Sequence, residues 1–103
     1  MLRNDMNLKQ EIEYVNDCFD KYEKEGFSKI FLSPYDLNRV GNNQGKSFKV
    51  LGRMRLAAEV DNGEYTSDLE SLPSWMIQFD DGETMVAYPE EIIPSEIKLN
   101  LIR

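Results

Sequence analysis

Carboxylates are the most numerous groups in this sequence that could do chemistry, since aspartate and glutamate supply 19 of its 103 residues. Five of them gather toward the C-terminal end, at Asp80, Asp81, Glu83, Glu90 and Glu91. Two carboxylates can hydrolyse a substrate when an apolar pocket raises the pKa of one of them. We expect these acids on a turn and on a surface helical turn, where water keeps them ionised. They also lack the alternating D-x-D-x-D-G spacing of a calcium-binding loop, so we predict a solvated acidic edge.

Other catalytic and metal-binding residues are scarce. The sequence has no histidine, which removes the commonest general base and the commonest zinc ligand. Its single cysteine, Cys18, therefore has no histidine to activate it. One cysteine cannot form an internal disulfide, nor a zinc site of about four ligands. We therefore expect no enzymatic activity, no cofactor and no metal site, with Cys18 as a buried structural thiol.

The stretch G-N-N-Q-G-K-S over residues 41–47 comes close to the G-x-x-x-x-G-K-[ST] loop that binds nucleotide phosphates. Its two glycines are one residue too close, because Val40 stands where the first should be. The expected order is also reversed, with a helix before the loop and a strand after it. Backbone N–H groups at a helix N-terminus therefore cannot hold a phosphate here, and we interpret the stretch as an ordinary loop.

Charge is unevenly distributed along this acidic chain, whose net charge is −7. Acidic residues dominate after residue 60, whereas basic residues dominate residues 27–60. An acidic protein is a poor general nucleic-acid binder, because phosphate contacts need a positive surface. The basic strand expected at 46–55 is an exception, and Lys49, Arg53 and Arg55 are its candidates for weak nucleic-acid binding. The alternative is that these three residues pair with acids on neighbouring strands.

Length and hydropathy predict a single domain, residues 1–103, in the cytoplasm. A chain of this length can bury a modest core without disulfides. No apolar run approaches the roughly 20 residues needed to span a bilayer. The N-terminus lacks the apolar segment of a signal peptide, so we expect no membrane association.

Residues 5–25 have the periodicity of an amphipathic helix. Apolar residues recur at spacings of three and four, at Leu8, Ile12, Val15, Phe19 and Tyr22. Gly26 would end the helix, since glycine adopts the left-handed conformation at little cost. We expect the apolar stripe to pack on the rest of this chain, so that the protein is a monomer. The alternative is a homodimer through the N-terminal helix, although the pattern is short for a coiled coil.

A short strand, a helical turn and a loop are expected over residues 27–46. Ser33 would cap the helical turn, with Pro34 at its first position and Gly41 after its end. Residues 47–60 alternate apolar and polar side chains, as a half-buried strand does. Gly52 interrupts this alternation, which indicates a bulge or a sharp bend.

The stretch W-M-I-Q-F-D-D-G-E-T-M-V-A-Y-P-E-E-I over residues 75–92 has the pattern of a hairpin followed by a helical turn. Apolar residues alternate on both sides of Asp81-Gly82, a pair that favours a tight turn with positive φ at both central positions. Pro89 begins a predicted 3₁₀ turn that ends at Ile92. Residues 97–101 alternate again and predict a closing strand.

The order of these elements resembles that of the Src-homology-3-like and Tudor-like small β-barrels. The resemblance covers residues 47–102 and rests on W-M-I-Q-F-D-D-G and A-Y-P-E-E-I. It is a resemblance of fold only, because the aromatic motif that opens true Src-homology-3 domains is absent. It implies an α+β fold, in which the N-terminal helix packs on a small, strongly bent SH3-like β-barrel of about five strands.

In barrels of this kind the long loop, the strand after it and the helical turn lie side by side. The resemblance therefore implies a shallow aromatic groove for a peptide or a methylated cation. Its candidate partner-binding residues are Trp75, Tyr65, Tyr88, Pro89 and Tyr35. For Trp75 the alternative is a place in the core, because it shares the alternation of Ile77 and Phe79, and the N-terminal helix would then cover the groove.

These observations favour a small, acidic, non-enzymatic binding module that contacts a protein partner with a basic surface. An acidic rim would steer that partner toward the groove, and its candidates are Glu64, Asp68, Glu70, Glu90 and Glu91. Two alternatives stay open. One is an inhibitor of the phage or mobile-element type whose acids mimic nucleic acid. The other is weak nucleic-acid binding through residues 46–55.

Overall fold

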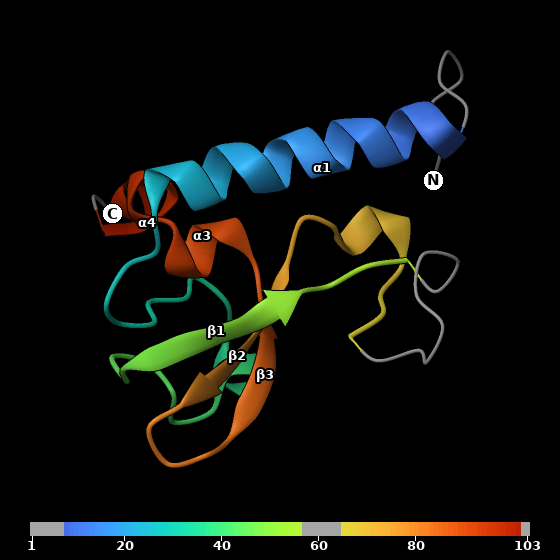
Figure 1. Ribbon diagram of the computed structural model, residues 1–103. Coiled ribbons are helices and arrows are strands. Elements are labelled where there is room, and N and C mark those ends of the chain that lie inside the picture. The colour runs from blue at the N-terminus through green and yellow to red at the C-terminus, as the bar shows by residue number, and fades with distance from the viewer. Residues whose placement is uncertain (1–7, 57–64, 102–103) are drawn as a thin grey trace.

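The structure is a computed structural model that describes residues 8–56 and 65–101, and its fold is α+β. A long N-terminal helix runs along one side of a three-stranded antiparallel sheet, and a short helix lies between them (Figure 1). The elements in chain order are α1 (Leu8–Glu25), α2 (Leu37–Val40), β1 (Phe48–Arg53), η2 (Leu69–Ser71), β2 (Trp75–Phe79), β3 (Thr84–Ala87), α3 (Pro89–Ile92) and α4 (Pro94–Leu101).

The helix α1 confirms the amphipathic helix predicted from the apolar spacing, over Leu8–Glu25. Val15 and Phe19 are buried in the core. Gly26, at φ +99°, donates its N–H to the carbonyl of Tyr22 at 3.0 Å, which ends the helix as glycine commonly does. The stripe is therefore used inside this chain, although its first residue, Leu8, stays exposed.

The strands β2 and β3 form the predicted hairpin. Phe79 donates its N–H to the carbonyl of Glu83 at 2.8 Å, and its own carbonyl accepts the N–H of Gly82 at 2.9 Å. Within the turn, all of which the structure describes, only Gly82 has a positive φ, of +93°. The turn was correctly predicted, but positive φ at both central positions was wrong. The loop has three residues, with glycine following a tight turn.

A bulge in β1 confirms the irregularity predicted at Gly52. Val50 pairs with Ile77, and Gly52 pairs with Met76, so Leu51 is an extra residue opposite β2. The sheet is bent at this point, because two residues of one strand face a single residue of the next.

The bulge also changes which face of the sheet each later residue occupies. Lys49 pairs with Gln78 and is exposed, whereas Arg53 pairs with Trp75, which is fully buried. Paired residues point to the same face of a sheet. Lys49 and Arg53 therefore lie on opposite faces, although strict alternation along the strand predicts that they share one.

The described residues do not form the expected five-stranded barrel, because three strands make an open sheet. The closing strand predicted at 97–101 is wrong, since these residues belong to α4. Pro94 suits the first turn of a helix, and Ile93 and Ile97 are buried at helical spacing. The carbonyl of Ile93 accepts the N–H of Ile97 at 2.9 Å.

Two further strand predictions are corrected by the structure. The strand expected after residue 27 is reduced to a single antiparallel bridge between Ile30 and Ser47. The long strand expected over 47–60 ends at Arg53, and residues 57–60 lie outside the described ranges.

The two short helices that flank the sheet also differ in detail from the prediction. Asp36, not Ser33, precedes α2, and its Oδ1 accepts the N–H of Arg39 at 3.3 Å. The turn α3 is α-helical rather than 3₁₀, since Ile93 donates its N–H to the carbonyl of Pro89 at 2.8 Å. The helix α2 ends beside β3 and the helix α3 begins where β3 ends, and this arrangement brings their side chains together.

Candidate functional site

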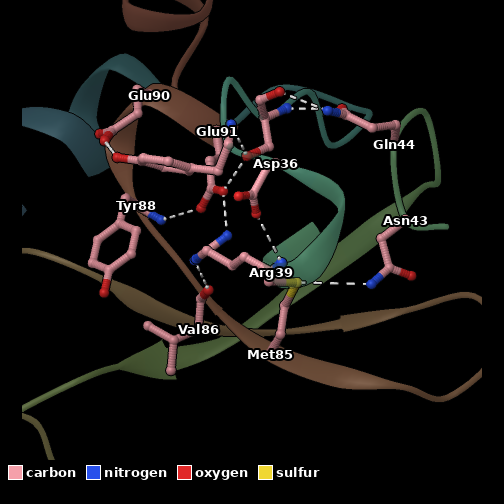
Figure 2. A network of polar contacts seen from close by, with 11 residues as sticks. Asp36, Arg39, Asn43, Gln44, Met85, Val86, Tyr88, Glu90 and Glu91 are labelled. Carbon is pink, nitrogen blue, oxygen red and sulfur yellow. Dashed lines mark hydrogen bonds and ion pairs between the residues drawn. The ribbon is translucent and has the colours of Figure 1, made fainter. Parts of the chain in front are cut away.

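The most densely connected polar cluster on the described surface lies where α2 and α3 meet beside β3. Figure 2 shows this cluster, which we call the α2–α3 edge. Its members come from the segment before α2, from α2 itself and from the start of α3, and they are Ser33, Tyr35, Arg39, Tyr88, Pro89, Glu90 and Glu91. Five of the predicted candidates, Tyr35, Tyr88, Pro89, Glu90 and Glu91, belong to it.

Glu91 holds this edge together from inside the protein. Its carboxylate is fully buried and accepts hydrogen bonds from the Ser33 hydroxyl at 2.5 Å and from Nη1 of Arg39 at 2.5 Å. Its other oxygen accepts the backbone N–H of Tyr88 at 2.9 Å, which caps the first turn of α3. The prediction that Glu91 forms part of an exposed acidic rim was therefore wrong. Its carboxylate is buried, and its hydrogen bonds and ion pair join α2 to α3.

Arg39 packs against two aromatic rings that also contact each other, with a centroid distance of 6.3 Å between Tyr35 and Tyr88. The centre of its guanidinium is 5.2 Å from the ring of Tyr35 and 5.0 Å from the ring of Tyr88, within the range of a cation–π contact. Its Nη2 donates to the carbonyl of Val86 at 2.7 Å, so the side chain also covers part of the open edge of β3. The ring faces that a methylated cation would contact there are therefore already occupied by a cation of this chain.

Tyr35 is the most exposed aromatic residue of this edge, with 40% of its surface accessible. Its hydroxyl donates to a carboxylate oxygen of Glu90, and this hydrogen bond is the main cause that raises the pKa of Tyr35 to about 12. Gln44 fixes the segment before Tyr35. Its side-chain oxygen accepts the N–H of Ser33 at 2.8 Å, and its side-chain nitrogen donates to the carbonyl of Ser33 at 2.6 Å. Tyr35 is thus exposed but held in position.

Trp75, the central candidate of the predicted groove, is fully buried. Its ring contacts Phe19 of α1 and Phe27 edge-on, at centroid distances of 5.2 and 5.4 Å. Its indole N–H donates to Glu23 of α1 at 3.0 Å. Trp75 therefore occupies a core position covered by the helix α1, which was the alternative prediction for this residue. A partner cannot reach it in this conformation.

Tyr65 is separated from the other candidate aromatic residues. It has an uncommon positive φ of 55°, and its carbonyl accepts the N–H of Arg55 at 2.8 Å. A Cβ atom added to Gly52 would be 3.6 Å from its ring, so Tyr65 lies over the bulge of β1. Tyr35 and Tyr88 lie at the opposite edge of the sheet, next to β3.

The acidic rim predicted from the sequence is not gathered on one side. Asp68 and Glu70 are exposed at η2, which lies beside α1, whereas Glu90 belongs to α3 (Figure 1). Asp80 and Glu83 lie at the hairpin turn, at the far end of the sheet. Glu64 lies outside the described residues. The acids that a nucleic-acid mimic would align on one face are therefore distributed over separate elements.

The predicted basic strip is also divided. Arg53 is bound to α1, where its guanidinium bonds Glu23 and Asp20, each at 2.8 Å. The hydrogen bond to Glu23 is the main cause that raises the pKa of Arg53. Arg55 is half-buried, and Lys49 lies on the other face of the sheet. The three residues offer no continuous surface to a phosphate backbone.

Two of the described carboxyl groups, those of Glu23 and Asp81, have a lowered pKa. Hydrogen bonds from Arg53 and from Lys46 lower the pKa of Glu23 and that of Asp81, respectively. A hydrolytic acid needs the opposite shift. Among residues 8–56 and 65–101, no cluster of His, Cys, Asp and Glu could hold a metal ion.

Comparison with known proteins gives no match, whether to a protein-family model, to a curated protein or to a solved structure. None of the helices in the described ranges has the length and apolar character that crossing a membrane requires.

Sequence reasoning missed Arg39 and Ser33, and it misplaced Glu91. One signal was present in Tyr88-Pro89-Glu90-Glu91. Pro89 occupies the first helical position and Glu91 the third, which is the spacing of a capping box. This spacing turns the carboxylate of Glu91 back toward the helix start. No local signal indicates that Arg39, far away in the sequence, meets it there.

Proposed function

We propose that this protein is a non-enzymatic binding module that contacts a protein partner with a basic surface through the α2–α3 edge. The observation that carries the proposal is the exposed Tyr35 ring, whose hydroxyl is bonded to Glu90 and whose ring contacts Arg39. Tyrosine is enriched among the residues that dominate binding energies. A ring that is already fixed loses little conformational entropy when a partner covers it.

Electrostatics favours a cationic partner for this edge. The whole chain carries a net charge of −7. Arg39 is the cation of the edge, and its charge is matched by the buried Glu91. Asp36 is exposed next to Tyr35, and a basic surface would be steered toward it.

The partner contacts the outer side of the Tyr35 ring rather than entering between the two tyrosines. The rings of Tyr35 and Tyr88 contact each other at a centroid distance of 6.3 Å, and Arg39 packs against both rings. Glu91 and Val86 hold Arg39 there. A methylated lysine is therefore not a required feature of the partner. An arginine or lysine side chain of the partner can stack on the outside of the Tyr35 ring and lie close to the acidic Asp36.

A peptide titration tests this proposal. Nuclear magnetic resonance of the ¹⁵N-labelled protein is followed with a lysine- and arginine-rich peptide and with its glutamate-rich counterpart. We expect the cationic peptide to shift the amide signals of Tyr35, Asp36 and Glu90, with an affinity that weakens as salt is added. The acidic peptide is expected to leave these signals unchanged.

Matched tyrosine variants locate the binding. Tyr35→Ala is expected to weaken the cationic peptide at least tenfold. Tyr14→Ala is the control, because Tyr14 is a tyrosine of α1 with 51% of its surface accessible. Equal losses in the two variants, or no binding tighter than about 1 mM, would contradict the proposal.

A second proposal concerns the fold. We propose that the sheet is an open relative of the Src-homology-3-like and Tudor-like barrels. Support comes from the order of a bulged first strand, a β2–β3 hairpin and a helical turn directly after it. An experimental structure in which the residues outside the described ranges add strands to this sheet supports the barrel, and one in which they add none contradicts it.

A further inference from the structure

The sheet has a second face that the hydrophobic core does not use. Trp75, Ile77 and Phe79 point from β2 into the core, so Met76 and Gln78, which alternate with them, point the other way. We call this the outer sheet face. Its residues follow from the strand pairing and are Lys49, Leu51, Met76, Gln78, Thr84 and Val86.

Leu51 is the prominent apolar residue of the outer sheet face. It is the extra residue of the bulge, and 38% of its surface is accessible. Met76 pairs with Gly52 on one side and with Val86 on the other, so an apolar row crosses all three strands beside Leu51. Tyr65 extends this row at Gly52, whose added Cβ would meet its ring at 3.6 Å.

A hollow lies next to Leu51 along the same strand. Its volume is about 340 Å³, and it is lined by Phe48, Lys49, Gln78, Phe79, Asp80 and Gly82. Lys49 is two residues before Leu51, which in a strand corresponds to roughly 7 Å. An exposed leucine and a hollow large enough for a leucine side chain thus lie side by side.

We propose that the outer sheet face is an interface between two copies of this chain, with Leu51 of each copy in the hollow of the other. An interface with two-fold symmetry uses the same patch twice, so a protruding side chain and its receptor site must both lie on that patch. A two-fold axis that crosses β1 between Lys49 and Leu51 places each leucine over the opposite hollow. The apolar row of Met76 and Val86 is covered in the same step.

The charges of this face fit a second copy better than a strongly charged partner. The hollow contains one cation, Lys49, and one anion, Asp80, and within the described residues neither forms an ion pair. The face is therefore close to neutral, although the chain carries −7. Repulsion between the two copies comes mainly from other surfaces, and salt screens it. Dimerisation should thus strengthen with moderate salt, whereas binding of a basic partner at the α2–α3 edge weakens.

Sedimentation equilibrium over a range of protein and salt concentrations tests this interface. We expect a monomer–dimer equilibrium for the natural sequence and at least a tenfold weaker dimer for Leu51→Asp. Leu51→Met, which keeps an apolar side chain of similar volume, should stay within about threefold of the natural dimer. Leu8→Asp is the matched control, since Leu8 of α1 is 45% accessible and lies away from the sheet. A protein that stays monomeric up to about 1 mM, or a Leu51→Asp variant that dimerises normally, overturns the proposal.

Photo-crosslinking tests the arrangement without relying on a destabilising substitution. Benzoylphenylalanine is placed at position 51 in one preparation and at position 8 in another. We expect a covalent dimer only from position 51, with the link mapped to Lys49 or to residues 78–82 of the second copy. A link to a peptide outside the outer sheet face, or equal crosslinking from position 8, overturns the two-fold arrangement.

Discussion

The indole N–H of Trp75 donates to the carboxylate of Glu23 at 3.0 Å, and the same carboxylate accepts two hydrogen bonds from Arg53, each at 2.8 Å. A residue of β2, a residue of α1 and a residue of β1 are thereby joined at one carboxyl group. Trp75 is fully buried beneath this group, with Phe19 against its ring. The helix α1 thus covers the tryptophan, and the partner surfaces that we propose lie elsewhere, at the α2–α3 edge and on the outer sheet face.

The stability of the protein should fall in acid through Glu23. The hydrogen bond from Arg53 lowers the pKa of Glu23 below its ordinary value of 4.5, so the folded state favours the ionised carboxylate. A lowered pKa contributes stability above the unfolded value, and this contribution is lost as pH falls below 4.5 and through the folded pKa. Urea unfolding at pH 7 and at pH 3 measures the loss. Glu23→Gln should reduce the difference between the two pH values, and an unchanged difference would contradict the assignment.

Removal of the buried carboxylate at the α2–α3 edge should destabilise the fold strongly. Glu91→Ala leaves Arg39 without its ion pair and the Ser33 hydroxyl and Tyr88 N–H without their acceptor. The expected cost is about 3 kcal/mol, the lower part of the range for a broken buried pair, because Arg39 is partly exposed. Chemical denaturation measures it. Glu90→Ala is the neighbouring control and should cost less than about 1 kcal/mol.

Tyr35 should ionise later than an ordinary tyrosine. Its hydrogen bond to Glu90 raises its pKa from 10.0 to about 12, because the carboxylate disfavours a second negative charge beside it. The raised pKa contributes stability below pH 10, which is lost as pH rises through about 12. Ultraviolet titration of the natural protein minus that of Tyr35→Phe isolates this group from the other tyrosines. Glu90→Gln should move the difference curve toward pH 10, and a curve that does not move would refute the role of Glu90.

A glycine of the hairpin turn, Gly82, and a glycine of β1, Gly52, should respond differently to alanine. Gly82 has a φ of +93°, which a residue with a Cβ atom adopts only with strain, so Gly82→Ala should cost about 1 kcal/mol. Gly52 has no positive φ, and an added Cβ would make an ordinary contact with the Tyr65 ring at 3.6 Å. Gly52→Ala should therefore cost clearly less than Gly82→Ala in thermal unfolding. The reverse order would show that the bulge, rather than the turn, depends on glycine.

Ser74 offers a stabilising substitution. Its hydroxyl is fully buried just before β2, and within the described residues it has no hydrogen-bond partner. A buried hydroxyl without a partner costs about 1–3 kcal/mol of desolvation. Ser74→Ala should thus leave the melting temperature unchanged or raise it. A clear decrease would show that the hydroxyl has a partner in solution, such as a bound water molecule.

Local patterns in the sequence predicted the elements whose signals lie within a few residues. The apolar spacing of Val15 and Phe19 fixed α1, and Asp81-Gly82 between two alternating runs fixed the hairpin. Gly52 in an alternating strand indicated the bulge. These features depend on backbone preferences and on a periodicity that each segment carries by itself.

The last segment shows where such patterns are ambiguous. Residues 93–101 are apolar both at every second position from Ile97 and at every fourth position from Ile93. Alternation alone favoured a closing strand, but Pro94 begins a helix and two buried isoleucines bind it to the core. Packing decided between two periods that the sequence contains at the same time.

The sequence by itself determined the first helix, the β2–β3 hairpin, the acidic balance and the absence of histidine. Only the tertiary structure decided which side chains meet. The single residue added at Leu51 placed Arg53 on the opposite face from Lys49 and brought it to Glu23. Glu91 turned inward because a capping glutamate points back along its helix, where Arg39 could neutralise it. Contacts between residues far apart in the chain depend on the combined geometry of every element between them. A local sequence pattern therefore does not predict them.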